Sequence, residues 1–191
     1  MSWLDEARHI VRKVIDARTA IGIPVSKVQT GLGPREELTL SHVLEALGQL
    51  DECVRYLNTR RSGGSPIKIS NEADLQDLIF IMLRPWFEDL VPENPTDKIA
   101  SRFVVKDFLS KTLNLVIEAK FIRDRKHGRG VSKELHDDIE TYRNHPACSH
   151  LVFVIYDPGK WIPDIRSLKR QIEVSRVYDG RTLEVRCIVK T

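Results

Sequence analysis

Hydrophobic and polar residues recur along the chain at two different periods, and these divide it into helices and strands. Apolar residues spaced three or four apart predict amphipathic helices over residues 3–19, 41–59, 72–84, 133–144 and 163–173. Short apolar runs bounded by turn residues predict strands over residues 102–109, 114–121, 151–156 and 183–189, with a short strand or turn near 87–91. The order of these elements predicts an α/β fold, in which helices flank a mixed β-sheet and further helices form an N-terminal extension.

One stretch of the chain has the composition of a linker. Ser62-Gly63-Gly64-Ser65-Pro66 combines flexible and turn-forming residues and predicts a boundary between two regions. Residues 1–62 would then be a helical accessory region, and residues 67–191 the main domain. The apolar stripe of the 41–59 helix, with Ser41 as its predicted N-cap, could pack on the first helix, on the main domain or on a partner chain. For residues 1–62 we therefore expect docking to a partner protein or homo-oligomerisation.

The predicted strand over residues 114–121 carries two charges in an otherwise apolar run. Glu118 and Lys120 are two residues apart, so the alternation of strand side chains places both on one face together with Val116. Charges on a central strand cost free energy unless they are paired or bind something. This conflict is the strongest indication of a functional site in the sequence.

A third charged residue belongs to the same region. Asp107 lies in the preceding strand on the face of Leu109, and the turn at residues 110–112 makes the two strands a β-hairpin. Plausible registers make Asp107 and Glu118 diagonal neighbours, with backbones about 7–8 Å apart. Two carboxylates at that spacing repel each other, and a divalent cation between them removes the repulsion. The structural alternative is a buried salt bridge that joins both carboxylates to Lys120.

The helix over residues 72–84 offers a further carboxylate. Its N-cap is Asn71 or Ser70. At about 100° per residue, Glu72 lies roughly 60° from the centre of the apolar face, whereas Asp74 and Asp77 lie roughly 100° and 160° away. Glu72 is therefore the acid placed to face a cleft at the edge of the core. The alternative is a favourable charge in the first turn of a helix.

Directly after the charged strand comes a cationic segment. Its basic residues are Arg123, Arg125, Lys126, Arg129 and Lys133, set against a single acid, Asp124. With glycines at 128 and 130 we interpret residues 123–130 as a loop, followed by a helix that Ser132 caps. Dense cations on a flexible backbone suit nucleic-acid phosphates better than base edges. An ordinary solvated loop is the alternative.

Composition changes this picture little. The length of 191 residues allows one domain with an appendage or two small domains, and 41% hydrophobic with 30% charged residues is typical of globular proteins. The net charge of +3 permits a polyanionic partner without requiring one. Cys53, Cys148 and Cys187 are far apart and favour a reducing cytoplasm over a disulfide framework or a structural zinc site. No apolar stretch approaches the roughly 20 residues that span a membrane, so we expect a soluble protein.

The arrangement of these charged residues resembles that of a known superfamily. Asp107, followed by Glu118-Ala119-Lys120 at the edge of the next strand, resembles the PD-(D/E)XK nucleases, although Lys106 stands where the motif has proline. The helix that bears Glu72 precedes them, as the first helix of that superfamily does. Within it, the catalytic domain of the DpnII/MboI-type restriction endonucleases is similar to this chain over about residues 67–190, and the similarity rests on residues 71–78, 104–109, 115–120, 133–142 and 151–158.

The resemblance implies a divalent-metal-dependent nuclease that hydrolyses phosphodiester bonds of a nucleic acid, as an effector of restriction or antiphage defence. DNA is the expected substrate, and the sequence alone leaves the choice between DNA and RNA open. It implies Mg²⁺ or Mn²⁺ bound by Asp107, Glu118 and the Ala119 carbonyl, with Glu72 completing a second metal site or orienting a water. Lys120 would position the attacking water, stabilise developing charge or act as a base.

Two alternatives remain open at this point. Asp138 and Tyr142, on the predicted 133–144 helix, could reach the scissile region, or they could serve packing and capping. The whole domain could also be a catalytically inactive module that keeps the nuclease scaffold for binding nucleic acid or for assembly.

Overall fold

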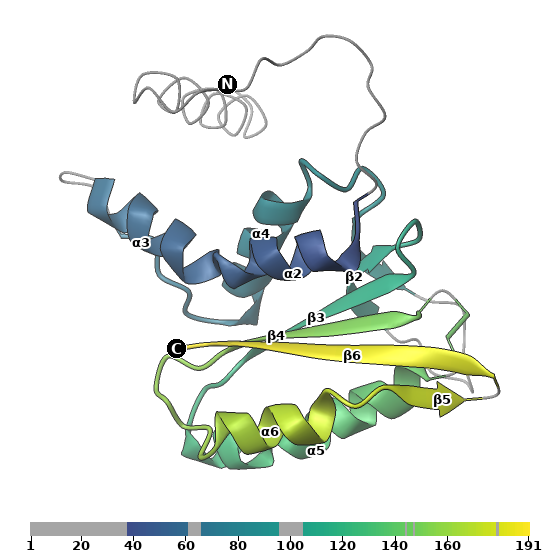
Figure 1. Cartoon of the computed structure of the whole chain (residues 1–191). Coiled ribbons are helices and arrows are strands. Elements are labelled where there is room, and N and C mark those ends of the chain that lie inside the picture. Colours follow the sequence, from purple (N-terminus) through teal and green to yellow (C-terminus); the bar gives the residue numbers. More distant parts are fainter. Residues whose placement is uncertain (1–37, 61–65, 96–104, 144, 147, 179) are drawn as a thin grey trace, which may run out of the picture. The chain divides into compact units, whose positions relative to one another are not determined.

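The computed structural model describes residues 38–60, 66–95, 105–143, 145–146, 148–178 and 180–191 (Figure 1). The helix expected over residues 3–19 lies outside these ranges. Residues 38–191 form one compact unit, which begins upstream of the boundary expected at 62–66. The docking or dimerisation role of residues 1–62 stays a prediction.

A mixed β-sheet forms the centre of this unit. Within the described ranges it has six strands, in the spatial order β1 (Val91–Pro95), β2 (Val105–Ser110), β3 (Leu115–Phe121), β4 (His150–Tyr156), β6 (Arg181–Lys190) and β5 (Arg176–Tyr178). The pairs β1–β2, β2–β3 and β5–β6 are antiparallel, whereas β3–β4 and β4–β6 are parallel. The predicted α/β fold and the β2–β3 hairpin are thus confirmed.

Helices cover both faces of the sheet. Figure 1 shows α2 (Leu40–Gly48), α3 (Leu50–Arg60) and α4 (Glu72–Leu83) on one side, and α5 (Arg125–Tyr142) and α6 (Ile165–Ile172) on the other. The central strands β3 and β4 are parallel and covered on both faces, which explains their almost continuous apolar sequences. None of the helices in the described part of the chain is long and apolar enough to span a membrane.

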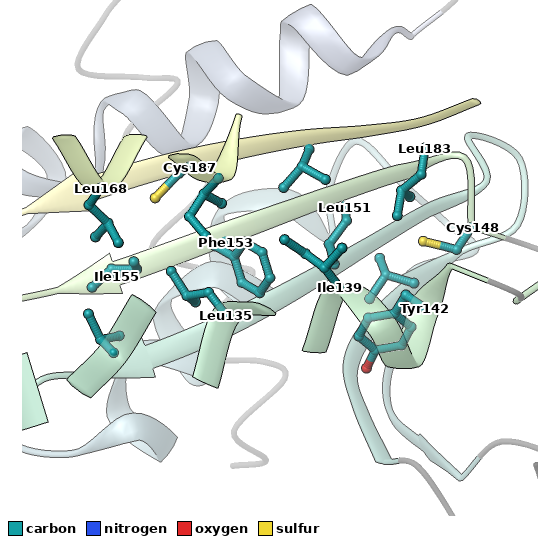
Figure 2. Close-up of a cluster of buried hydrophobic side chains, with 14 of the residues drawn as sticks. Leu135, Ile139, Tyr142, Cys148, Leu151, Phe153, Ile155, Leu168, Leu183 and Cys187 are labelled. Atoms are coloured by element: carbon teal, nitrogen blue, oxygen red, sulfur yellow. The ribbon is translucent and has the colours of Figure 1, made fainter. Parts of the chain in front are cut away.

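Alternate residues of β3 enter two separate hydrophobic clusters. Leu115, Ile117 and Ala119 pack with α2 and α4, while Val116 packs with α5 and α6. Figure 2 shows the second cluster, in which Leu135 and Ile139 of α5 lie against β4. The predicted division of β3 into two faces is confirmed, and it places Glu118 and Lys120 on the α5 side.

The helix expected over residues 41–59 is two helices. The N-cap of α2 is Thr39, whose backbone N–H donates to Nδ1 of His42 at 3.1 Å, and not Ser41 as expected. The helical run is interrupted at Gln49, directly after Gly48. Lys190, at the end of β6, is held at this break, because its Nζ donates to the carbonyl oxygen of Gly48 at 2.6 Å. The Lys190 hydrogen bond ties α2 to the sheet.

The cationic segment is the start of α5 and not a loop. Asp124 is the N-cap, since its Oδ1 accepts from the backbone N–H of His127 at 2.8 Å, so the cap expected at Ser132 is wrong. Gly128 is buried, and a Cβ added there would lie 2.6 Å from the backbone of Trp161. The glycine therefore serves a close approach between α5 and the segment before α6, and not the flexibility that we expected.

Candidate active site

The β2–β3 hairpin opens at the position of the charged residues. The paired positions end at Phe108 opposite Ile117. Continued by one residue, this register would set Asp107 opposite Glu118, whereas the sequence predicted diagonal neighbours. Asp107 Oδ2 instead accepts a hydrogen bond from the backbone N–H of Ala119 at 2.6 Å. The carboxylate thus satisfies a backbone donor where the ladder ends, which holds Asp107 against β3.

Glu118 and Lys120 are both contacted by α5. Glu118 is only 5% exposed, and its Oε1 accepts a hydrogen bond from the hydroxyl of Tyr142. Lys120 Nζ lies 2.9 Å from Oδ2 of Asp138 in an ion pair that is largely shielded from solvent. The buried salt bridge considered from the sequence would have joined Lys120 to Asp107 and Glu118, whereas the ion-pair partner of Lys120 is Asp138.

Burial and mutual repulsion shape the electrostatics of the two carboxylates. Burial, and then the charge of Asp107, raise the pKa of Glu118 to about 8, although the Tyr142 hydrogen bond and Lys120 oppose the change. Burial also raises the pKa of Asp107, while hydrogen bonds from Ala119 and from the side chain of Gln76 act against it. Two acids that resist ionisation this close together form a site where a cation is favourable.

For Lys120 the neighbouring charges together have a larger effect on the pKa than burial has. Burial lowers the pKa of its ammonium, but the ion pair with Asp138 and the nearby Glu118 and Glu72 outweigh burial, so the pKa is raised. Without a metal the lysine therefore remains a charged donor.

Glu72, the first residue of α4, contacts the end of β3. Its Oε2 accepts a long hydrogen bond of 3.4 Å from the backbone N–H of Phe121. Glu72, Lys120 and Phe121 line a cavity of about 450 Å³ together with Arg123 and other residues just before α4 and on α5. Asp107 and Glu118 are not among the residues that line this cavity, so Glu72 and Lys120 are the predicted catalytic residues that face a space open to a ligand.

The five predicted phosphate-binding cations divide into two groups. Arg123 lines the cavity, whereas Arg125, Lys126, Arg129 and Lys133 are exposed on α5. At about 100° per residue, the positions of Arg125, Arg129 and Lys133 share one stripe, and Asp138 lies roughly 140–220° from it. The helix therefore directs this stripe away from the side that contacts Lys120.

Comparison with models of protein families gave a match over most of the chain. The model of a restriction endonuclease family described as REase_DpnII-MboI covers residues 41–188. The chain belongs to the DpnII-MboI restriction endonuclease family. This confirms the resemblance found in the sequence, and the match begins upstream of residue 67, so that it includes α2 and α3. No curated protein and no solved structure matched significantly.

Family membership makes the chain one of a group of DNA-cleaving nucleases and gives the geometry a context. Sequence reasoning had missed Gln76, which contacts Asp107, although it stands four residues after Glu72 and thus on the same side of α4. It had also missed His127 of α5, whose Nε2 lies 3.2 Å from Oε2 of Glu134 beside the cavity. In both cases helical spacing was the available signal.

The donor set of this DpnII-MboI family member suits a hard divalent cation. Within the described ranges, no three His, Cys, Asp or Glu side chains gather as a metal site. Mg²⁺ commonly binds through only one or two carboxylates and keeps several waters, however, so the carboxylates of Asp107 and Glu118 with the Ala119 carbonyl are sufficient. Their resistance to ionisation in the absence of a cation supports this fit.

Proposed function

We propose that this DpnII-MboI family member is a divalent-metal-dependent endonuclease that hydrolyses phosphodiester bonds in DNA. The observation that carries the proposal is the meeting of Asp107 and Glu118 where the β2–β3 ladder ends, with Lys120 two residues further along β3. Phosphodiester hydrolysis needs an attacking water and compensation for the charge that develops on the phosphate. Two neighbouring carboxylates, and an ammonium that lines an open cavity, are the groups that this chemistry requires.

In this proposal the carboxylates of Asp107 and Glu118 and the carbonyl of Ala119 hold Mg²⁺ or Mn²⁺, and Glu72 completes a second site or orients a water. Such an ion acidifies a bound water and neutralises phosphate charge. Lys120 lines the cavity, so its ammonium can contact a substrate phosphate and stabilise the charge that develops there.

The exposed cations of α5 give the DNA a second region of contact. Arg123 would contact a phosphate at the cavity, whereas Arg125, Lys126, Arg129 and Lys133 would follow the backbone outside it. Contacts of this kind position the duplex and carry no sequence information. We infer in addition that the enzyme is a restriction-type effector against foreign DNA, as its restriction endonuclease family suggests. We also infer that it works in the cytoplasm, as its three widely separated cysteines suggest.

The proposal is tested with the purified chain of 191 residues. Supercoiled plasmid and single-stranded oligonucleotides are incubated with Mg²⁺, with Mn²⁺ or with EDTA. We expect cleavage of DNA by the wild type only when metal is present, and none by Glu118→Gln, which removes the charge and keeps the shape. Glu140→Gln is the matched control, because Glu140 is exposed on α5 and pairs with Arg143.

Two results would contradict the proposal. One is the absence of metal-dependent cleavage on every substrate, and the other is full activity in Glu118→Gln. The first result would favour the inactive nuclease-like module that binds nucleic acid, and the second would exclude Glu118 from catalysis.

A further inference from the structure

Each of the two charged side chains of β3 is contacted by one polar side chain of α5. The Tyr142 hydroxyl donates to Oε1 of Glu118, and Asp138 Oδ2 lies 2.9 Å from Lys120 Nζ. Asp138 and Tyr142 are four residues apart, so they lie on the same side of the helix, one turn from each other. A single rigid element therefore sets the positions of both charged groups.

The rest of the sheet-facing side of α5 is apolar. Val131, Leu135 and Ile139 are each at most 1% exposed and belong to the hydrophobic cluster. Figure 2 shows the ring of Tyr142 at one end of this cluster, with its hydroxyl oxygen pointing out of it. Asp138 and Tyr142 thus bring polar atoms to this side of α5 where it passes Glu118 and Lys120, and packing alone does not require them.

We propose that Tyr142 and Asp138 are positioning residues of the nuclease site, an inference that rests on the proposed function. Tyr142 fixes the orientation of the Glu118 carboxylate by engaging one of its oxygens, and leaves Oε2 to the cation. Asp138 fixes the Lys120 ammonium at the edge of the cavity. The spacing between the metal-binding oxygen and the ammonium is then set by one turn of α5. Groups that orient a ligand in this way commonly govern metal affinity and rate.

The role of Tyr142 is tested by measuring Mn²⁺ binding calorimetrically on the full chain without DNA. Tyr142→Phe keeps the ring and its packing and removes only the hydroxyl. Loss of such a partner typically weakens metal affinity about 10–100-fold, which is the effect we expect. Tyr178→Phe is the control, because its ring lies against Arg143 instead of the site. Wild-type Mn²⁺ affinity in Tyr142→Phe, whether or not the melting temperature falls, would overturn the role of Tyr142.

The role of Asp138 is tested separately by kinetics, at a partly exposed position where folding is less at risk. We expect Asp138→Asn to lower kcat by about tenfold or more while KM for DNA changes little, because a misplaced ammonium affects the transition state more than substrate binding. Asp138→Glu should restore part of kcat, and Asp137→Asn is the neighbouring control. An unchanged kcat, or a change in the melting temperature alone, would overturn this role.

Measurements on the wild-type protein distinguish a failure of this inference from a failure of the proposed function. If the wild type neither binds Mn²⁺ nor cleaves DNA, both fail. If it does both, and the two variants behave as the wild type does, the inference alone fails.

Discussion

The Asp107 carboxylate accepts a hydrogen bond from the backbone N–H of Ala119, between the two residues of β3 that carry charge. This contact gives Asp107 a structural task besides the proposed metal binding. It also brings the negative charge of Asp107 close enough to raise the pKa of Glu118. The two tasks can be separated, because an amide oxygen accepts the same hydrogen bond without the charge.

We therefore expect Asp107→Asn to fold, and in EDTA at pH 8 to be at least as stable as the wild type, since the repulsion with Glu118 is gone. Cleavage of DNA should fall by at least about 100-fold, because one cation ligand is lost. Mg²⁺ should raise the melting temperature of the wild type and leave that of the variant nearly unchanged. A variant that cleaves normally would exclude Asp107 as a metal ligand.

The stability of the metal-free protein should depend on the protonation of Glu118. Its pKa is raised by folding from 4.5 to about 8, so the folded state binds the proton more tightly. The resulting stabilisation is complete below about pH 4.5 and is lost as the pH rises through about 8. In EDTA the melting temperature of the wild type should fall between pH 5 and about 8.5 more steeply than that of Glu118→Gln. Equal slopes in the two proteins would contradict the assignment.

Two glycines in the first half of α5 should respond to alanine in opposite directions. A Cβ at Gly128 would lie 2.6 Å from the Trp161 backbone, whereas nothing lies within 4 Å of one at Gly130. We expect Gly128→Ala to lower the free energy of unfolding by about 1–3 kcal/mol through overpacking. Gly130→Ala should raise it by roughly 0.5–1 kcal/mol through helix propensity. Chemical denaturation measures both, and a stabilised Gly128→Ala would rule out the close approach.

The cationic stripe of α5 should affect binding rather than chemistry. Replacing Arg125, Arg129 and Lys133 together by glutamine should weaken DNA binding and reduce the slope of log K against log salt by up to about 2.7, for three lost phosphate contacts. DNA binding is measured with the triple substitution in the Glu118→Gln background, in which cleavage is not expected. In the protein that retains Glu118, the triple substitution should change kcat at saturating DNA little. The control variant replaces Lys68, Lys111 and Arg181 by glutamine. These three residues are exposed, and their replacement removes the same amount of positive charge. Equal losses in both triple variants would indicate net charge alone.

The sequence by itself determined the elements whose signals are local. The alternation along β3 separated Glu118 and Lys120 from Ile117 and Ala119, and the clusters on the two faces of the sheet confirm it. Asn71 was one of two N-caps predicted for α4, and its side chain accepts from the backbone N–H of Asp74. Local patterns succeed here because strand alternation and helix capping involve residues only a few positions apart.

The sequence was misleading where a residue served a distant contact. Gly128 indicated a loop because glycine is costly inside a helix, and only the Trp161 backbone packed against it explains its presence there. The register of the hairpin, which pairs Phe108 with Ile117 and so brings Asp107 near Glu118, depended in the same way on the pairing of whole strands.

Tertiary structure alone decided how the candidate site is assembled. Glu118 meets Tyr142 across 24 residues of sequence, and Glu72 reaches the backbone of Phe121 across 49. Each contact depends on how a helix packs on the sheet, which is set by the summed burial of apolar side chains and not by the polar residues themselves. The sequence motif therefore identified the charged residues of β3, while the packing of α4 and α5 on the sheet determined which residues contact them.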